Sequence, residues 1–326
     1  MRYERYGSLA VIIASLLWSF DAVLRRHLYV LPAPVIVFWE HAIGFIVLLP
    51  YLLTSLKAFK KLTRKQWASI TIVAFLSGAV GTILYTAALG RIQYIPFSVV
   101  VLLQQLNPIF AIAASALLLK ERLTRRFLGL SAIALIAAYF VTFPDIKVNF
   151  ATGTGTVIAA LFAVGAAAAW GTSTALSKYS LKDTSFVHIT ALRFGITPIF
   201  ALIFVGLSGS SQALTNIQLD QFKYLVLITF STGLVALTVY YFGLQRVLAS
   251  RAAILELAWP ASAVLVGWIW LDQKLTLSQI IAAAVLTFTV IQIAKESSNE
   301  TDLNQTKTHK KPLKNKKRSL KSATIS

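Results

Sequence analysis

The sequence contains no cysteine, and it has only four histidines. Without thiols the chain can form no disulfide, no Cys-ligated zinc site, no thiol nucleophile and no Cys-linked lipid anchor. Three of the histidines fall at segment ends or in the C-terminal tail, so we expect no metal site and no cofactor: His27, His188 and His309. The sequence also has no Walker A, GxGxxG or HExxH motif, so nothing in it indicates an ATPase, a dinucleotide enzyme or a zinc protease.

Charged residues are scarce as well, at 13% against 57% hydrophobic residues, and the mean hydropathy is +0.71. A soluble domain has about 25% charge, so a soluble globular protein is excluded. The apolar residues occur in blocks of about 20, the length of a membrane-spanning helix. We therefore expect an all-α integral membrane protein with ten transmembrane helices, at residues 6–24, 34–54, 67–89, 95–119, 127–143, 155–177, 187–207, 224–244, 252–271 and 278–294.

The few charges are unevenly distributed. The chain has 31 Lys and Arg against 12 Asp and Glu, a net charge of +19. If both termini are cytoplasmic, 24 of the cations lie inside and six outside, as the positive-inside rule requires. This pattern predicts an orientation and not a nucleic-acid partner. The missing cysteine favours a bacterial plasma membrane, and the polar, basic residues 295–326 are expected to form a disordered cytoplasmic tail.

The chain repeats itself at a spacing of about 152 residues. Trp18 corresponds to Trp170, Pro108 to Pro260, and KERLT (120–124) to DQKLT (272–276). LGRI (89–92) corresponds to LQRV (244–247) at a spacing of 155. The spacing predicts two five-helix repeats, in residues 1–148 and 149–294. Because five is odd, the second repeat would be inverted in the membrane, which places a binding site near the midplane between the halves.

Three segments carry a resemblance to a known family: LLWSFDAVLRR (16–26), LLQQLNPIFAIAASALLLKERLT (102–124) and ILELAWPASAVLVGWIWLDQKLT (254–276). With them the chain resembles an EamA-type, ten-span member of the drug/metabolite transporter superfamily over residues 7–294. The resemblance implies a transporter, with export as the direction. The family's Glu near the end of the fourth span matches Glu121, whereas the second half has Gln273, so a role shared by both halves is not implied beyond structure.

Four ionisable residues lie inside apolar spans: Asp21, Glu40, Arg193 and Glu256. Each costs about 2.5–3.5 kcal/mol at the bilayer centre on insertion scales, so each needs a partner, water or a function. Glu40 and Arg193 occupy matching positions. The pattern predicts a gated ion pair at a central cavity, and the alternatives are a permanent structural salt bridge or two ions that never meet. His41, next to Glu40, either relays a proton or bonds a backbone carbonyl.

Glu256 stands four residues before Pro260, and Gln104 stands four before Pro108. A proline deprives the carbonyl four residues earlier of its donor and kinks the helix, so we expect polar side chains at two kinks. Gln105 and Asn107 add donors and acceptors nearby. Glu256 is the best candidate for proton coupling or substrate binding, and the alternative is a neutral carboxylic acid bonded locally.

The remaining candidates are less specific. Asp21 lies on the same helical face as Trp18 and is a candidate for substrate contact. The alternative is a local ion pair near the outer surface with Arg25, one turn further on. Trp18 and Trp170 are candidate aromatic walls of the cavity. Tyr240 has an apolar face and a hydroxyl tip that could line the path.

We therefore expect a secondary transporter that moves a small organic metabolite by alternating access, without ATP and with protons as a candidate coupling ion. Its partners would be the lipid bilayer and the substrate, and a homodimer is compatible with the sequence. Two alternatives are a non-transporting scaffold or receptor that uses the basic tail, and a membrane enzyme for lipid-linked substrates. The second would need clustered acids or a nucleophile near one membrane face, whereas the acids here lie singly in separate spans.

Overall fold

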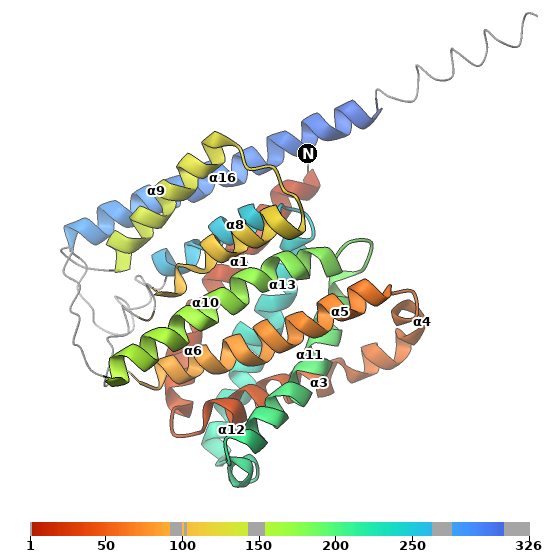
Figure 1. Cartoon of the computed structure of the whole chain (residues 1–326), viewed down its shortest axis with the longest axis vertical. Helices are drawn as coiled ribbons and strands as arrows, with labels where there is room; N and C mark the ends of the chain where they lie inside the picture. The colour runs from red at the N-terminus through yellow and green to blue at the C-terminus, as the bar shows by residue number, and fades with distance from the viewer. Residues whose placement is uncertain (1, 92–99, 101–102, 143–153, 263–275, 310–326) are drawn as a thin grey trace, which may run out of the picture.

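The computed structural model describes residues 2–91, 100, 103–142, 154–262 and 276–309 (Figure 1). Each of the ten expected segments contains helix within these residues. The main helices are α1 (Arg2–Trp18), α2 (Asp21–Arg25), α3 (Ala33–Thr54), α4 (Leu56–Phe59), α5 (Arg64–Val73), α6 (Thr82–Leu89), α8 (Asn107–Leu118), α9 (Arg125–Thr142), α10 (Thr154–Ser180), α11 (Phe186–Leu207), α12 (Leu219–Ile228), α13 (Leu234–Leu244), α14 (Ala249–Leu255) and α16 (Leu277–His309).

The described residues contain seven helices that are long and apolar enough to cross a membrane, and a shorter apolar helix at Asn107–Leu118. Three of the ten expected segments are not among these seven: 95–119, 127–143 and 252–271. Parts of 95–119 and 252–271 lie outside the described residues, and 127–143 is occupied by the 18-residue helix α9. Gln273 and the repeat boundary at 148/149 also lie outside the described residues. Large apolar side chains are exposed along the outer helices, for example Leu117, Leu161, Leu207 and Phe288. In a membrane these side chains would contact lipid.

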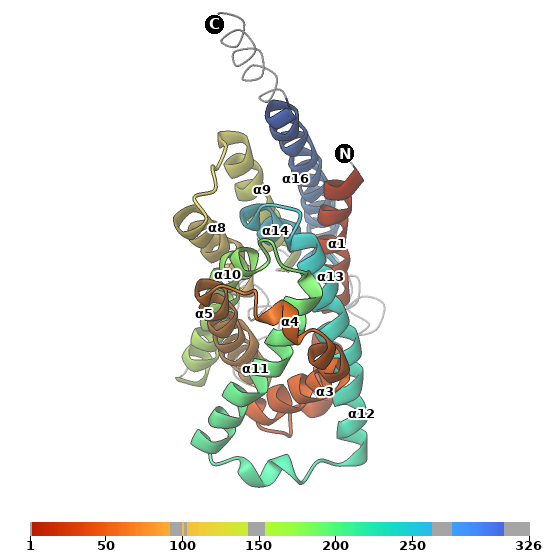
Figure 2. The same ribbon diagram turned by 90° about the vertical axis from the view of Figure 1, so that its right-hand side faces the viewer.

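The C-terminal tail differs from the expectation of disorder. Helix α16 continues without a break from Leu277 to His309, although residues 295–309 are polar. Residues 277–311 contain no Gly or Pro. A helix that has already formed extends at little cost, because its nucleation has been overcome. Residues 310–326 lie outside the described residues. Both views place the start of α1 and the end of α16 at the same end of the molecule (Figures 1 and 2).

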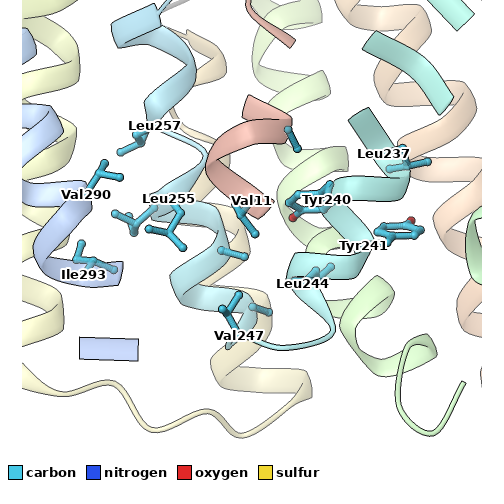
Figure 3. Close-up of a cluster of buried hydrophobic side chains, with 14 of the residues drawn as sticks. Val11, Leu237, Tyr240, Tyr241, Leu244, Val247, Leu255, Leu257, Val290 and Ile293 are labelled. Atoms are coloured by element: carbon cyan, nitrogen blue, oxygen red, sulfur yellow. The ribbon is translucent and has the colours of Figure 1, made fainter. Parts of the chain in front are cut away.

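Helices from the two halves of the chain pack against each other in pairs. Helix α3 lies against α11, α1 against α13, α8 against α10, and α9 against α16 (Figures 1 and 2). A buried apolar cluster joins α1, α13, α14 and α16 (Figure 3), with Val11, Leu244, Leu255 and Ile293 fully buried in it. The halves are therefore interleaved and share one core.

Polar contacts also join the halves, and one of them involves Glu121. Glu121, which follows α8, accepts hydrogen bonds from the backbone N–H groups of Ala249 and Ser250 at 2.8 and 3.0 Å, and from the Ser250 hydroxyl at 2.6 Å. The carboxylate thus caps the first turn of α14, where the backbone donors have no partner within the helix. Glu121 accordingly has a structural role, at the position where the second repeat has Gln273.

Two of the long helical segments are interrupted at matching places. Residues Ala74–Gly81, between α5 and α6, and Thr229–Gly233, between α12 and α13, form π-helical turns. They lie 155 positions apart, the spacing of the LGRI and LQRV motifs. A π-turn widens the helix and alters which backbone carbonyls have a donor in the helix.

Candidate functional site

A cavity of about 200 Å³ lies between the halves of the chain. Twelve of the thirteen candidate site residues from the sequence line this cavity. They come from seven of the ten predicted apolar segments, in both halves of the chain. The twelve are Trp18, Asp21, Glu40, His41, Gln104, Asn107, Pro108, Trp170, Arg193, Tyr240, Glu256 and Pro260. Gln105 is buried but does not line the cavity.

One wall of the cavity holds a buried cluster centred on Arg25. Its Nε donates to Asp21 Oδ2 at 2.8 Å, and its Nη2 donates to Asp21 Oδ1 at 3.0 Å and to Glu40 Oε2 at 3.1 Å. Thr232, from the other half, donates to Asp21 Oδ1 at 2.7 Å. Arg25 is 2% exposed. Two acidic side chains thus share one guanidinium inside the protein.

Among the described residues, Glu40 and Arg193 do not pair with each other, as in the alternative of two ions that never meet, and each has other partners. Glu40 pairs with Arg25, which the sequence placed at the outer surface. Arg193 Nη1 donates to the Tyr241 hydroxyl at 2.9 Å, and its Nη2 donates to Ser77 Oγ at 2.8 Å. The physical reason is proximity: Arg25 follows Asp21 by one turn and reaches Glu40, while neutral oxygens satisfy two of the Arg193 nitrogens. Glu40 and Arg193 both line the cavity, as separate charged groups.

Glu256 has only neutral partners. The Tyr240 hydroxyl donates to its Oε1 at 2.5 Å, and Asn107 Nδ2 donates to its Oε2 at 3.2 Å. Among the described residues, no Lys or Arg forms an ion pair with it. An ionised carboxylate in an apolar surrounding without a cation is costly. The group is therefore suited to bind a proton or a cationic ligand.

The helices are broken beside both prolines that line the cavity. Turn residues 105–106 precede Pro108, which lies in the first turn of α8, and turn residues 256–257 precede Pro260. Glu256 itself follows the last residue of α14. The breaks bring polar side chains and backbone groups to the cavity from two helices that would otherwise present apolar surface.

Two aromatic pairs lie at equivalent places in the halves. The rings of Trp18 and Tyr240 are 5.2 Å apart, and those of Trp170 and Tyr85 are 5.1 Å apart. All four residues line the cavity. Each pair joins the first span of one half to the third span of the other, at the repeat spacings of 152 and 155.

The indole nitrogens of these pairs extend the equivalence. Trp18 Nε1 donates to the backbone carbonyl of Thr232 at 3.0 Å, and Trp170 Nε1 donates to that of Ser77 at 3.1 Å. Both carbonyls belong to the π-helical turns. His41, in contrast, contacts only its own helix by hydrogen bond, from Nδ1 to the Val37 carbonyl at 2.9 Å. Its geometry matches the structural alternative, and its ring packs against Phe194 at 5.0 Å.

Sequence reasoning missed several cavity residues. Arg25 was assigned to the surface, Ser77 was interpreted as one of a cluster of small helix-packing residues, and Thr174 and Thr232 were not considered. The internal repeat could have indicated a further cavity residue. Ser177 stands 152 positions after Arg25, the repeat spacing, and it also lines the cavity. Hydroxyl residues are common in helices and carry no distinctive pattern, so the repeat is the only signal in the sequence.

Comparison with known proteins gives matches in both halves. The model of the EamA-like transporter family matches residues 5–143 and 157–294. The riboflavin transporter ImpX of Fusobacterium nucleatum is 32% identical over 297 residues, which cover 89% of this chain and 97% of that protein. The pseudopaline exporter CntI of Pseudomonas aeruginosa is 30% identical over 181 residues, 55% of this chain and 60% of that one.

Two more distant similarities support the same fold. An uncharacterised transporter of Archaeoglobus fulgidus is 23% identical and covers 87% of this chain and 95% of its own length. A solved crystal structure superposes with a TM-score of 0.67 at 18% sequence identity, over 87% of this chain and 94% of that chain. At this identity the superposition establishes the fold alone.

Proposed function

Because the chain belongs to the EamA-like transporter family, we propose that it is a secondary transporter that moves a small organic metabolite across a bacterial plasma membrane without ATP. Membership makes it an integral membrane transporter and not an enzyme, which sets aside the lipid-linked enzyme. The observation that carries the proposal is the central cavity, in which charged, amide and aromatic side chains from both halves meet between apolar helices.

The architecture we propose is ten spans in two inverted five-helix repeats, with both termini in the cytoplasm. It is supported by the two matched family segments and by contacts that recur at the repeat spacing. The indole bonds of Trp18 and Trp170 and the two π-turns are the clearest of these. In such a fold, rocking of one half against the other opens the cavity to each side in turn.

Riboflavin is the first substrate to test. Its transporter in Fusobacterium is similar to this chain over nearly its whole length, and two aromatic pairs line the cavity here, as a flat ring system requires. We propose Glu256 as the coupling group, because it lines the same cavity and has neutral partners only. Protonation would remove its charge without displacing a cation.

The test is flux in proteoliposomes. Riboflavin efflux from loaded vesicles and uptake into empty ones are measured with and without a pH gradient, so export and import are both assayed. We expect riboflavin flux that the gradient accelerates in the wild type but not in Glu256→Gln, which keeps the shape of the side chain and cannot ionise.

A broad panel of vitamins, nucleosides, amino acids and cations is run in parallel. No flux of any solute would contradict transport and would leave the scaffold alternative. If only another solute is transported, that solute and not riboflavin is the substrate. If the pH gradient still accelerates flux in Glu256→Gln, a residue other than Glu256 couples transport to protons.

A further inference from the structure

Two residues that line the cavity, Gln104 and Asn107, have buried amide oxygens without a hydrogen-bond partner. Gln104 Nε2 donates to the backbone carbonyl of Ala163 at 2.9 Å, and Asn107 Nδ2 donates to Glu256. Because both partners are acceptors, each amide must direct its NH₂ group toward them and its oxygen elsewhere. Neither Gln104 Oε1 nor Asn107 Oδ1 has a hydrogen-bond partner within the described protein. A backbone carbonyl accepts at every pH, so the orientation of Gln104 does not depend on the state of Glu256.

These oxygens are buried. Gln104 is 5% exposed, and Oδ1 of Asn107 has almost no accessible surface. A buried acceptor without a donor costs about 1–3 kcal/mol, and two of them on one stretch of chain beside a cavity indicate a ligand that supplies donors. Neighbouring Ser173, from α10, also has a hydroxyl without a protein partner and lines the same cavity.

The aromatic residues contribute a different kind of surface. The N–H groups of Trp18 and Trp170 are occupied by backbone carbonyls, and the Tyr240 hydroxyl is occupied by Glu256. What remains of these side chains for a ligand is ring surface. Arg193 adds a hydrogen-bond donor to the acceptor oxygens of the two amides. Its Nε–H has no protein partner, whereas its other two nitrogens donate to Ser77 and Tyr241.

We propose that Gln104 and Asn107 are the specificity-determining residues of the cavity, and that they select planar heteroaromatic substrates with a ring N–H beside a carbonyl, a lactam or imide. The amide oxygens accept the N–H, and the aromatic pairs contact the ring faces. This inference rests on the proposed transport function and deepens it, because it identifies which edge of the substrate is recognised. It requires no carboxylate or phosphate on the substrate.

The experiment compares matched ligands that differ only in the donor. Binding of riboflavin and 3-methylriboflavin, in which the imide N–H is replaced, is measured by flavin fluorescence with the purified full-length chain. Xanthine and caffeine form a second pair, followed by competition. For at least one pair we expect the N–H ligand to bind the wild type about tenfold or more tightly, since the methylated one leaves the acceptors unpaired.

In Gln104→Leu the preference should fall to about threefold or less, with the loss confined to the N–H ligand. Gln105→Leu, the same exchange at the adjacent residue that does not line the cavity, should keep the wild-type ratio. The thermal midpoint of each variant shows that it is folded, and Asn107→Leu provides an independent variant if Gln104→Leu does not fold.

Equal binding of N–H and N-methyl ligands by the wild type would overturn the inference, as would a preference that Gln104→Leu and Asn107→Leu leave intact. Binding of neither pair would overturn it as well. Flux of any other metabolite in the same preparation would then leave the transporter proposal standing, so the two failures are distinguishable.

Discussion

At the scale of single residues, Arg25 is the group on which the charge balance of the cavity depends. It forms bonds to Asp21 and Glu40 from one guanidinium and is itself almost fully buried. A planar fork with several donors can serve two carboxylates at once, which a lysine ammonium does with less geometric fit. Removing the cation would leave two carboxylates facing each other in a surrounding with little water.

Arg25→Gln should therefore lower the free energy of unfolding by about 3–5 kcal/mol, because a buried pair that loses one partner leaves an uncompensated charge. The double variant Arg25→Gln/Glu40→Gln should recover part of this loss. Thermal or denaturant unfolding in detergent measures both. Arg26→Gln is the matched control, since Arg26 is exposed, and it should change little; equal effects of the two single variants would contradict the role of Arg25.

How far the sequence predicts the site is visible at this scale. Asp21, Glu40, Arg193 and Glu256 could be found because charges are rare in apolar spans, and all four line the cavity. Which of them pair could not be found, because pairing depends on helix rotation and on distances near 3 Å. Arg25 was placed at the surface because it stands at the end of its apolar segment, where hydropathy gives no depth.

At the scale of elements, the two π-turns are the feature that hydropathy could not reveal, since each lies inside an apolar segment that the sequence predicts as one continuous span. Each exposes a carbonyl to a tryptophan of the other half. At Ser77 the carbonyl also accepts from the Thr82 hydroxyl at 3.0 Å. The turns thus supply polar partners at the cavity without any charged residue.

Trp18→Phe and Trp170→Phe should each reduce stability by about 1 kcal/mol, the usual net value of one hydrogen bond. Each keeps an aromatic ring beside its tyrosine, so a larger loss is expected only on replacement by alanine, about 3–5 kcal/mol. Unfolding midpoints of the four variants provide the comparison. A strong loss in one Phe variant and none in the other would show that the two indoles are not equivalent.

Close helix contact provides a second prediction. A Cβ on Gly171 of α10 would stand 2.5 Å from the Asn107 carbonyl oxygen and 2.7 Å from Phe110 Cβ in α8. Gly171→Ala should force the helices apart and reduce stability by about 1–3 kcal/mol. Gly206→Ala, in α11, meets nothing within 4 Å and should leave the melting temperature unchanged or slightly higher. An unchanged melting temperature for Gly171→Ala would indicate looser packing than the structure has.

At the scale of the whole molecule, the fold class and the helix positions were predictable from block length, charge asymmetry and the repeat. The all-helical membrane fold follows from apolar blocks of spanning length, and the family match in two halves agrees with the repeat. The helical continuation to His309 was not predictable from composition, because polar residues without Gly or Pro are equally compatible with a disordered tail and an extended helix.

The contact of Glu121 with the first turn of α14 joins the halves through residues that do not themselves line the cavity. Glu121→Gln should weaken it by about 0.5–2 kcal/mol, the range for helix caps, because an amide oxygen replaces a carboxylate at the positive end of the helix. Glu121→Ala should cost more, since Ala249 and Ser250 would lose their acceptor. Stability measurements on both variants, beside Asp220→Asn at an exposed helix start, test this; three equal effects would argue against it.

In the alternating-access cycle proposed above, this contact would have a consequence. The residue that corresponds to Glu121 in the second repeat is Gln273, so the sequences of the two repeats differ by one negative charge at this position. In that cycle, the two conformations that the repeats exchange would differ in free energy, even with identical solutions on the two sides of the membrane. The empty carrier would rest mainly in one of them. Substrate arriving from the other side must first draw on the minor population, so its half-saturation concentration should be higher there than on the favoured side.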